Sequence, residues 1–529
     1  MLRQTFRKTL LTLAIACAGL SQALSQNPYL PMWEYIPDGE PYVFDDPDQP
    51  GRQRVYIYGS HDMLITGYCG RDLVAWSAPV DDLREWRYEG VIFDTEGLGD
   101  VLYAPDVAEC VDASGKKWYY LYPNNQVHKH QTMVARSDRP TGPFRVINWK
   151  DSLKRETVGI LGFDPAVFVD DDGRVYAYWG FREACMAELD PATMATVKPG
   201  TEIIRRHVND SKAKGVYRFF EASSMRKIKD KYVFIYSRST GDGEFGLGVA
   251  NSTLAYAYGN SPLGPFIYGG TIIDIRGRDL DDFGRPMYTA VPNGNTHGSI
   301  CEINGQWWVF YHRQTGLDEY SRQAMVAPVE VDVCEGPDGY VRISEGEYNS
   351  EGFCIEGLDP FCRYSAGIAC YFTGPKPAIH KWPRKIYSGS YVAPVRLDSI
   401  PLRQPYALAV NHNPVVNNTD SSVVGYKYFN FSKTYHCQGL QLSMNIVPKG
   451  YDATIDIYVN SPYVSRGARR IGQLFIDKDM PQVKTALLAD VASLAEMSGK
   501  KALFFIIRSD TKEQSLCDIL DFAFVSSNR

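Results

Sequence analysis

The side chains that could carry acid–base chemistry recur at regular places in the first 330 residues of this chain. Three aspartates, one glutamate and one histidine each precede a short aromatic segment: Asp38, Asp106, Asp164, Glu221 and His297. Carboxyl groups that are gathered away from water raise one another's pKa, which suits acid–base catalysis. Hydrolysis of a glycosidic bond uses such a pair, because one group protonates the leaving oxygen while the other activates water or attacks the sugar.

The aromatic segments give this repeat its register. Each reads as a β-strand that ends in a tyrosine; they are Arg54–Tyr58, Lys117–Tyr122, Arg174–Tyr178, Lys231–Tyr236 and Gln306–Tyr311. In four of the five units the polar residue precedes the closing tyrosine by 14 to 16 positions. The first unit is longer because a surface insertion, residues 45–51, separates Asp38 from Tyr58. One polar side chain per unit is typical of a radial β-fold.

We therefore predict an all-β chain with two folded parts. Residues 26–330 are expected to form a five-bladed β-propeller with the polar side chains at its hub. Residues 331–385 are rich in Gly, Pro and Cys and are expected to be a connector. Alternating strands return in residues 386–529, which predicts a C-terminal β-sandwich of the jelly-roll kind.

The N-terminus has the pattern of a secretory signal. A basic start is followed by the apolar stretch Leu10–Leu20 and a cleavage site after Ser25, so residues 1–25 are predicted to be a signal peptide. The chain is then exported, to the periplasm or outside the cell. Lipoprotein anchoring through Cys17 and a buried N-terminal helix are the alternatives. No later stretch reaches the roughly 18 apolar residues that a membrane helix needs.

Composition excludes several partners. The net charge of −6 and the absence of a basic run argue against nucleic acid. The cysteines have no zinc-site spacing, and an exported chain permits disulfides, for which Cys354, Cys362 and Cys370 are the strongest candidates. The aromatic share of 13% favours β-structure and sugar-facing surfaces. We expect a monomer that binds a polysaccharide or oligosaccharide.

Four motifs, in order, resemble glycoside hydrolase family 43, a family of five-bladed propeller arabinofuranosidases, xylosidases and arabinanases. They are Pro37–Phe44, Gly162–Phe168, Phe220–Met225, and His297–Ile300 together with Trp307–Arg313. This resemblance implies that Asp38 is the general base, Glu221 the general acid, and Asp164 the residue that orients the acid and tunes its pKa. In the family's entry motif an Asp precedes Pro, whereas here Asp38 precedes Gly, which leaves Glu40 as an alternative base.

The resemblance also implies supporting residues. Asp106 would lie at the hub and position other groups rather than react. His297 would line the hub and contact a central ion, such as a structural calcium, or a water. No other cofactor is expected. Trp33, Phe163, Trp179 and Phe181 are candidates for stacking on sugar or for the core. Arg313 is expected to bind a sugar hydroxyl or to pair with a carboxylate.

The expected activity is that of an inverting exo-glycosidase that removes terminal α-L-arabinofuranosyl residues from plant polysaccharide side chains. A β-xylosidase and a galactan-directed exo-glycosidase are alternatives, as is a non-catalytic carbohydrate-binding propeller. A sialidase is disfavoured because its Ser-x-Asp-x-Gly-x-Thr-Trp repeats are absent. The C-terminal sandwich resembles carbohydrate-binding modules of family 6 through Val424–Phe429, Thr454–Val459 and Asp518–Phe524. A domain that only braces the propeller is the alternative.

Overall fold

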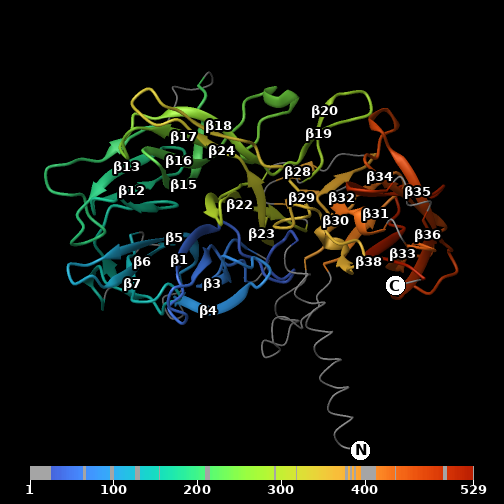
Figure 1. The fold of residues 1–529 in the computed structure, drawn as a ribbon, viewed down its shortest axis with the longest axis horizontal. Coiled ribbons are helices and arrows are strands. Elements are labelled where there is room, and N and C mark those ends of the chain that lie inside the picture. The colour runs from blue at the N-terminus through green and yellow to red at the C-terminus, as the bar shows by residue number, and fades with distance from the viewer. Residues whose placement is uncertain are drawn as a thin grey trace, which may run out of the picture.

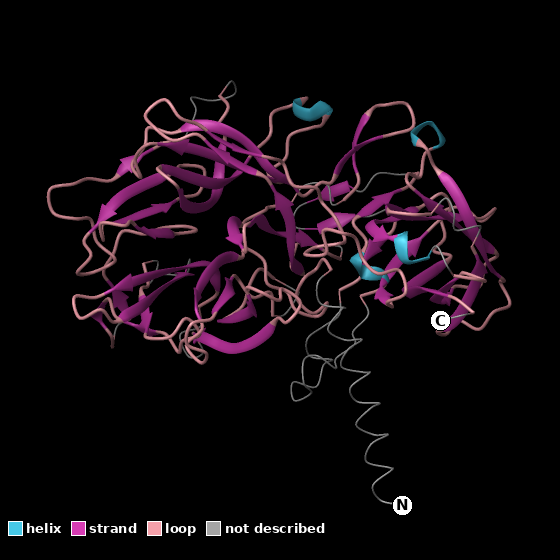
Figure 2. Cartoon of the chain, viewed as in Figure 1, coloured by secondary structure: helices cyan, strands magenta, loops and turns pink. Residues whose placement is uncertain are grey.

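The computed structural model describes most of the chain after residue 25. The described ranges are 26–63, 67–95, 100–125, 132–153, 155–208, 215–290, 294–316, 319–375, 379–381, 384–386, 389–394, 413–434, 437–491 and 497–527. The expected signal peptide and Cys17 lie outside them. Within these ranges no helix has the length and apolar character needed to cross a membrane. Figure 2 shows that strands dominate and that the helical elements are single short turns.

Five antiparallel sheets follow one another in the first part of the described chain. The first comprises β1 (Glu40–Asp45), β2 (Gln53–Tyr58), β3 (Asp72–Pro79) and β4 (Arg87–Asp94), and the second β5 (Leu102–Val111), β6 (Lys117–Asn125), β7 (Ala135–Ser137) and β8 (Arg145–Val146). The third comprises β11 (Ala166–Val169), β12 (Val175–Trp179), β13 (Cys185–Leu189) and β14 (Ile204–Arg205). The fourth comprises β15 (Phe219–Ile228), β16 (Lys231–Arg238), β17 (Thr253–Gly259) and β18 (Ile267–Asp274), and the fifth β21 (Ser299–Ile303), β22 (Gln306–Gln314) and β23 (Arg322–Val329).

Shorter elements connect these sheets and the domain that follows them. The hairpins pair β9 (Trp149–Asp151) with β10 (Glu156–Thr157), β19 (Arg278–Leu280) with β20 (Pro286–Tyr288), β24 (Val331–Val333) with β25 (Val341–Ile343), and β28 (Ile379–Lys381) with β29 (Arg384–Ile386). The 3-10 turns are η3 (Glu244–Gly246), η4 (Ala366–Ile368), η7 (Phe431–Thr434) and η8 (Val464–Arg466).

The five sheets close into a ring, which is the arrangement of a β-propeller. The first strands β1, β5, β11 and β15 contact one another in chain order, and β21 contacts β1. Hydrogen bonds from Ser224 and Arg226 on β15 to Ser299 and Ile300 on β21 complete the circle. A separate apolar cluster lies between each neighbouring pair of sheets, including the fifth and the first. The predicted all-β propeller is confirmed, and Figure 1 shows it as the blue-to-green half of the molecule.

The N-terminal segment forms hydrogen bonds with the last sheet of the ring. The Asn27 side chain donates to the Val326 carbonyl at 2.7 Å and accepts from the Val326 N–H at 3.0 Å. The Tyr29 N–H donates to the Ala324 carbonyl at 3.3 Å. Residues 27–29 therefore lie along β23, the outer strand of the three-stranded fifth sheet. Tyr29 also joins the apolar cluster between the fifth and first sheets.

The C-terminal domain is a sandwich of two antiparallel sheets around one apolar core. One sheet holds β26 (Tyr364–Ser365), β30 (Tyr391–Val392), β31 (Val415–Asn418), β33 (Gln441–Pro448), β36 (Thr485–Asp490) and β38 (Cys517–Val525). The other holds β27 (Tyr371–Thr373), β32 (Val423–Asn430), β34 (Ala453–Val459), β35 (Arg469–Ile476) and β37 (Lys500–Arg508). The predicted sandwich is confirmed.

Two strands place part of the expected connector inside the sandwich. β26 pairs with β38, and β27 pairs with β32. The sandwich sheets therefore begin near residue 364 rather than at residue 386, because these short edge strands carried no alternating pattern long enough to recognise. Cys370 directly precedes β27 as a buried free thiol in the core between the fourth and fifth sheets of the propeller, whereas Cys354 and Cys362 pack against the sandwich core. The expected pairing of Cys370 with either of them is wrong.

Candidate active site

The three carboxyl residues expected to react sit where the innermost strands begin. Asp38 and Asp164 precede β1 and β11 by two residues, and both have a left-handed backbone, with φ of 60° and 48°. Glu221 lies in a β-bulge of β15, and Ala222 beside it has φ of 65°. Non-glycine residues in this region carry local strain, and bulges redirect side chains next to active sites. At all three positions an irregular backbone conformation therefore sets the direction of the carboxyl side chain.

Strand register shows which entry residue is equivalent to Asp164. In the first sheet Glu40 is opposite the closing tyrosine Tyr58, and in the third sheet Ala166 is opposite Tyr178. Asp38 and Asp164 each lie two positions earlier than these residues. Asp38, rather than Glu40, therefore occupies the place in its sheet that Asp164 occupies in the third.

One cavity brings the three carboxyl groups together. It has a volume of about 660 Å³, and Asp38, Asp164 and Glu221 all line it. Each of these residues is buried, with 4%, 4% and 6% of its surface exposed. A concave site with buried titratable groups is the expected form of a small-ligand site. Glu40, Asp106 and His297 are not among the residues that line it.

Asp38 is held in its ionised form. Burial alone would raise the pKa of Asp38, but the Arg322 guanidinium and other nearby donors lower it below its ordinary value. Nη1 of Arg322 donates to both carboxylate oxygens at 3.2 Å, and the Ser60 hydroxyl donates at 2.6 Å. His312 accepts from the Asp38 N–H at 3.2 Å, and burial lowers the pKa of His312 to about 3, so its ring stays neutral.

Glu221 has the opposite electrostatic environment. Burial and then the Asp164 charge raise the pKa of Glu221 well above its ordinary value. Burial also raises the pKa of Asp164 to about 7, with the Asp38 charge adding to the rise. Asp164 accepts from Asn124 at 2.8 Å and from the Ala222 N–H at 3.2 Å. Asp164 therefore braces the backbone beside Glu221 and disfavours its ionisation.

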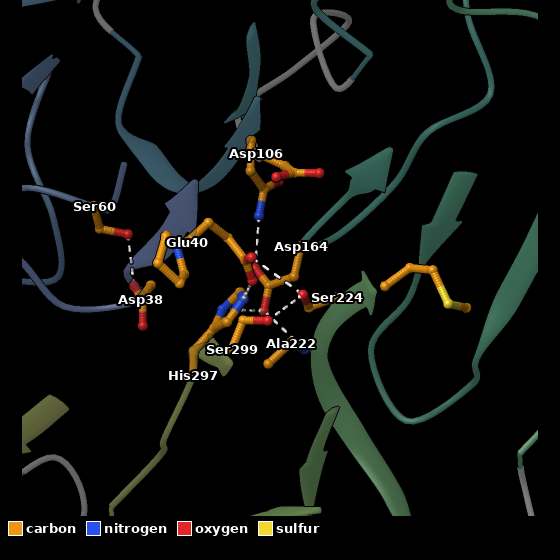
Figure 3. A network of polar contacts seen from close by, with 12 residues as sticks. Asp38, Glu40, Ser60, Asp106, Asp164, Ala222, Ser224, His297 and Ser299 are labelled. Carbon is orange, nitrogen blue, oxygen red and sulfur yellow. Dashed lines mark hydrogen bonds and ion pairs between the residues drawn. The ribbon is translucent and has the colours of Figure 1, made fainter. Parts of the chain in front are cut away.

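Below the cavity, a polar network ties the hub together (Figure 3). His297 lies between Asp164 and Glu40, with N–O distances of 3.6 and 3.8 Å. Burial opposes protonation, but Glu40 and the aspartates raise the pKa of His297 to about 9. Glu40 accepts from Arg226 at 2.8 Å and from Ser224 at 3.1 Å. Glu40 and His297 therefore lie next to the cavity residues without lining the cavity themselves.

Asp106 also holds neighbouring sheets together. Its two carboxylate oxygens accept from the Tyr42 hydroxyl and from the Val167 N–H, each at 2.6 Å. Burial, followed by the Glu40 charge, raises the pKa of Asp106 to about 7. This side chain thus links the first, second and third sheets.

A calcium ion at the hub would need several oxygen donors around it. Oε1 of Glu40 and Nε2 of His297 are buried without a hydrogen-bond partner. Calcium takes six to eight oxygen ligands. No group of three or more His, Cys, Asp or Glu side chains among the described residues could hold a metal ion. The protein groups at the hub do not form a calcium cage, and we derive no step through a metal.

Of the four aromatic candidates, two line the cavity. Phe163 and Phe181 do so, with ring centroids 5.3 Å apart, and Phe181 is 46% exposed. Trp33 and Trp179 are instead buried in the clusters between sheets, so their assignment to sugar stacking is wrong. Trp179 ends strand β12, all of whose residues are buried, and Trp33 lies in a turn that precedes β1.

The sequence reading missed the other aromatic residues of the cavity. Phe220 lines it with its ring centroid 5.2 Å from that of Phe181, and Tyr103 and Tyr68 line it as well. Phe220 could have been predicted, because it directly precedes Glu221 in the same motif.

Arg313 does not reach the cavity, so its expected contact with sugar is wrong. It is 2% exposed and donates to Gln323 and to the carbonyls of Gly367 and Ala369. The hydrogen bonds of its guanidinium thus join the propeller to the sandwich. Arg182 and Arg322, neither of which was predicted, are arginines that line the cavity. Nothing in the local sequence of Arg322 distinguishes it, because its partner Asp38 is remote in the chain.

Comparisons with known proteins show which family this sequence matches. The model of the family described as glycosyl hydrolases family 43 matches residues 49–333. A protein of Thermoclostridium stercorarium named xylosidase/arabinosidase is 34% identical over 450 residues, covering 80% of this chain and 85% of that protein. A β-xylosidase of Xylanibacter ruminicola is 27% identical over 353 residues, covering 58% of this chain and 96% of that protein.

A solved structure is similar along nearly the whole chain. It is a family 43 arabinoxylan arabinofuranohydrolase from Bacillus subtilis in complex with cellotetraose. The sequence identity is 20% and the TM-score 0.45, with 96% of this chain and 100% of that chain covered.

Proposed function

This chain belongs to glycosyl hydrolases family 43, and from that premise we propose that it is an inverting exo-glycosidase acting on terminal pentosyl residues of plant polysaccharides. α-L-Arabinofuranosyl residues are the first choice of substrate. The proposal assigns Asp38 as the base and Glu221 as the acid.

One observation carries this proposal: two carboxyl groups of one cavity have pKa values displaced in opposite directions. The pKa of Asp38 is lowered and that of Glu221 is raised. Carboxyl pairs whose environments separate their pKa values mark the acid and the base of an active site. A sugar-binding propeller without catalysis would not need this separation.

In the proposed reaction, the protonated Glu221 donates its proton to the glycosidic oxygen. Asp38 removes a proton from a water that attacks the anomeric carbon from the opposite face, so the product forms with inverted configuration. Asp164 holds the backbone beside Glu221 and keeps Glu221 protonated through its charge. Arg322 keeps Asp38 ionised between turnovers.

Two alternatives differ only in the sugar. A β-xylosidase is favoured by the names of the relatives, which include xylosidase/arabinosidase and β-xylosidase. A galactan-directed exo-glycosidase is the other. For the rest of the chain we propose export through the N-terminal signal, a monomeric state, and a sandwich that braces the propeller through Arg313.

The test is release of nitrophenol from aryl α-L-arabinofuranoside, β-D-xyloside and β-D-galactoside. We expect Glu221→Gln and Asp38→Asn each to lower kcat/KM by roughly 10²- to 10⁴-fold, the usual contribution of a general acid or base. Proton NMR of the first anomer formed tests inversion. Equal nitrophenol release by wild type and Glu221→Gln, or initial retention, would refute the assignment.

A further inference from the structure

A fourth carboxyl group faces the catalytic cavity, and the proposed reaction gives it no role. Glu319 lines the cavity with only 4% of its surface exposed. It lies in the segment between β22 and β23 of the fifth sheet. Tyr68, which also lines the cavity, comes from the segment between β2 and β3 of the first sheet. The two residues meet across the boundary between these sheets.

Tyr68 and Glu319 form a hydrogen-bonded pair. The Tyr68 hydroxyl donates to the Glu319 carboxylate. Burial and then the Glu319 charge raise the pKa of Tyr68, so the phenol keeps its proton. A phenol has one proton, and this one is directed to Glu319. The pair therefore offers lone pairs, and no further proton, to a ligand in the cavity.

The pair lies on the Asp38 side of the cavity. The Arg322 guanidinium sits over the Tyr68 ring, 5.1 Å from its centroid, and Tyr320 packs edge-on against the same ring. Arg322 in turn donates to Asp38 at 3.2 Å and to Asp62 at 2.9 Å. Two carboxylates thus already oppose the one positive charge of Arg322.

The other side of the cavity is different in character. Phe220 directly precedes Glu221, and its ring packs against that of Phe181. Aromatic rings, with the Arg182 guanidinium lying over those of Phe181 and Phe220, therefore flank the acid, while carboxylate acceptors and Arg322 flank the base. The leaving group departs on the acid side, so the sugar whose bond breaks lies toward the base.

We propose that Glu319, positioned by Tyr68, binds a hydroxyl of the sugar whose glycosidic bond is cleaved and restricts that position to neutral sugars. This inference rests on the proposed function, because it places that sugar on the Asp38 side. A sugar hydroxyl is a donor that matches the acceptor oxygens of Glu319 and Tyr68, and a hydrogen bond to a charged acceptor is among the stronger ones. An acidic sugar would bring a second negative charge against the buried Glu319, which disfavours binding.

The first experiment measures Glu319→Gln, which keeps the shape but removes the charge, on aryl α-L-arabinofuranoside and β-D-xyloside. We expect kcat/KM for the better substrate to fall roughly 10- to 100-fold, mainly through kcat, since hydroxyl contacts strengthen in the transition state. Glu109→Gln, a substitution outside the cavity, is the control. The same assay on analogues lacking one hydroxyl each identifies the contact: for one analogue, wild type and Glu319→Gln should differ by less than about twofold. An equal loss on the parent and every deoxy analogue would overturn the proposal.

A binding experiment separates this inference from the proposed function. Calorimetry with wild type and Glu319→Gln measures affinity for L-arabinose, D-xylose and D-glucuronate. We expect the substitution to weaken binding of the better pentose about tenfold and to improve binding of the uronate. If wild type released no nitrophenol from either glycoside but showed these affinity changes, the proposed function would fail and the role of Glu319 would stand. No pentose binding by wild type, or identical affinities for both proteins, would refute the role of Glu319 whatever the turnover.

Discussion

Nη1 of Arg322 donates to both carboxylate oxygens of Asp38, at 3.2 Å each, although 284 positions separate the two residues. The last strand of the fifth sheet thereby fixes the charge of a residue that precedes the first strand. Burial would otherwise raise the pKa of Asp38. The chemistry of the cavity therefore depends on closure of the ring.

Replacing Arg322 should change the pH dependence of the reaction as well as its rate. A base works only in its ionised form, so activity falls as the pH drops through its pKa. In Arg322→Ala the pKa of Asp38 should rise, and the acidic limb of kcat/KM should move to higher pH. Arg322→Lys, which keeps the charge but loses the planar fork, should lie between alanine and wild type. An acidic limb that stays in place in Arg322→Ala would contradict the role of Arg322.

Asp38 and Glu40 should separate in kinetics. We expect Asp38→Asn to lower kcat/KM by roughly 10²- to 10⁴-fold and to lower the free energy of unfolding as well, because it weakens the buried pair with Arg322. Glu40→Gln weakens the buried pair with Arg226 and should lower the free energy of unfolding by about 1–3 kcal/mol while kcat/KM changes less than in Asp38→Asn. Denaturant titration and aryl glycoside kinetics on both variants measure this. A larger kinetic loss in Glu40→Gln would make Glu40 the base.

Glu221 should lower the free energy of unfolding at neutral and alkaline pH. Its folded pKa is raised, so its contribution is favourable only below its ordinary value of 4.5 and is lost as the pH rises toward the folded pKa. Glu221→Gln removes the ionisable proton and should unfold at a higher temperature than wild type at pH 8. At pH 4 the difference should shrink. Thermal unfolding at both pH values tests this, and the same difference at each pH would be evidence against a raised pKa.

Arg313 should matter for the junction of the two domains and not for sugar binding. In Arg313→Leu the carbonyls of Gly367 and Ala369 lose their donor in a buried place. Each such loss costs about 1–3 kcal/mol of unfolding free energy. We expect a lower unfolding temperature with KM nearly unchanged. A raised KM with normal stability would restore the sugar-binding interpretation.

The repeat made the propeller and three of its cavity residues predictable. In four of the five units the polar residue keeps a near-constant offset from a closing tyrosine, and an insertion accounts for the longer offset of Asp38, so the sequence aligned Asp38 with Asp164 and Glu221. Figure 1 shows the sheets that carry these residues arranged in chain order around one centre. The repeat also predicted Asp106 and His297 at the hub, but not that both lie beneath the cavity.

The wrong predictions share a cause. A local sequence pattern shows neither where a side chain points nor which distant residues it contacts. Trp33, Trp179 and Arg313 have residue types common in sugar sites, yet the two tryptophans pack between sheets and Arg313 donates to a carbonyl of the sandwich. Arg322 and Glu319 reach the cavity only because the fifth sheet closes against the first. Short edge strands such as β26 carry too few residues to show a period.

The proposed mechanism requires that Asp38 is ionised and Glu221 is protonated in one cavity at neutral pH. The pH profile of kcat/KM for wild type and Glu221→Gln tests it most directly, with an aryl glycoside whose leaving group needs little protonation. We predict a bell-shaped profile for wild type and loss of the alkaline limb, with residual activity, in Glu221→Gln. An alkaline limb that remains unchanged in Glu221→Gln would contradict the claim.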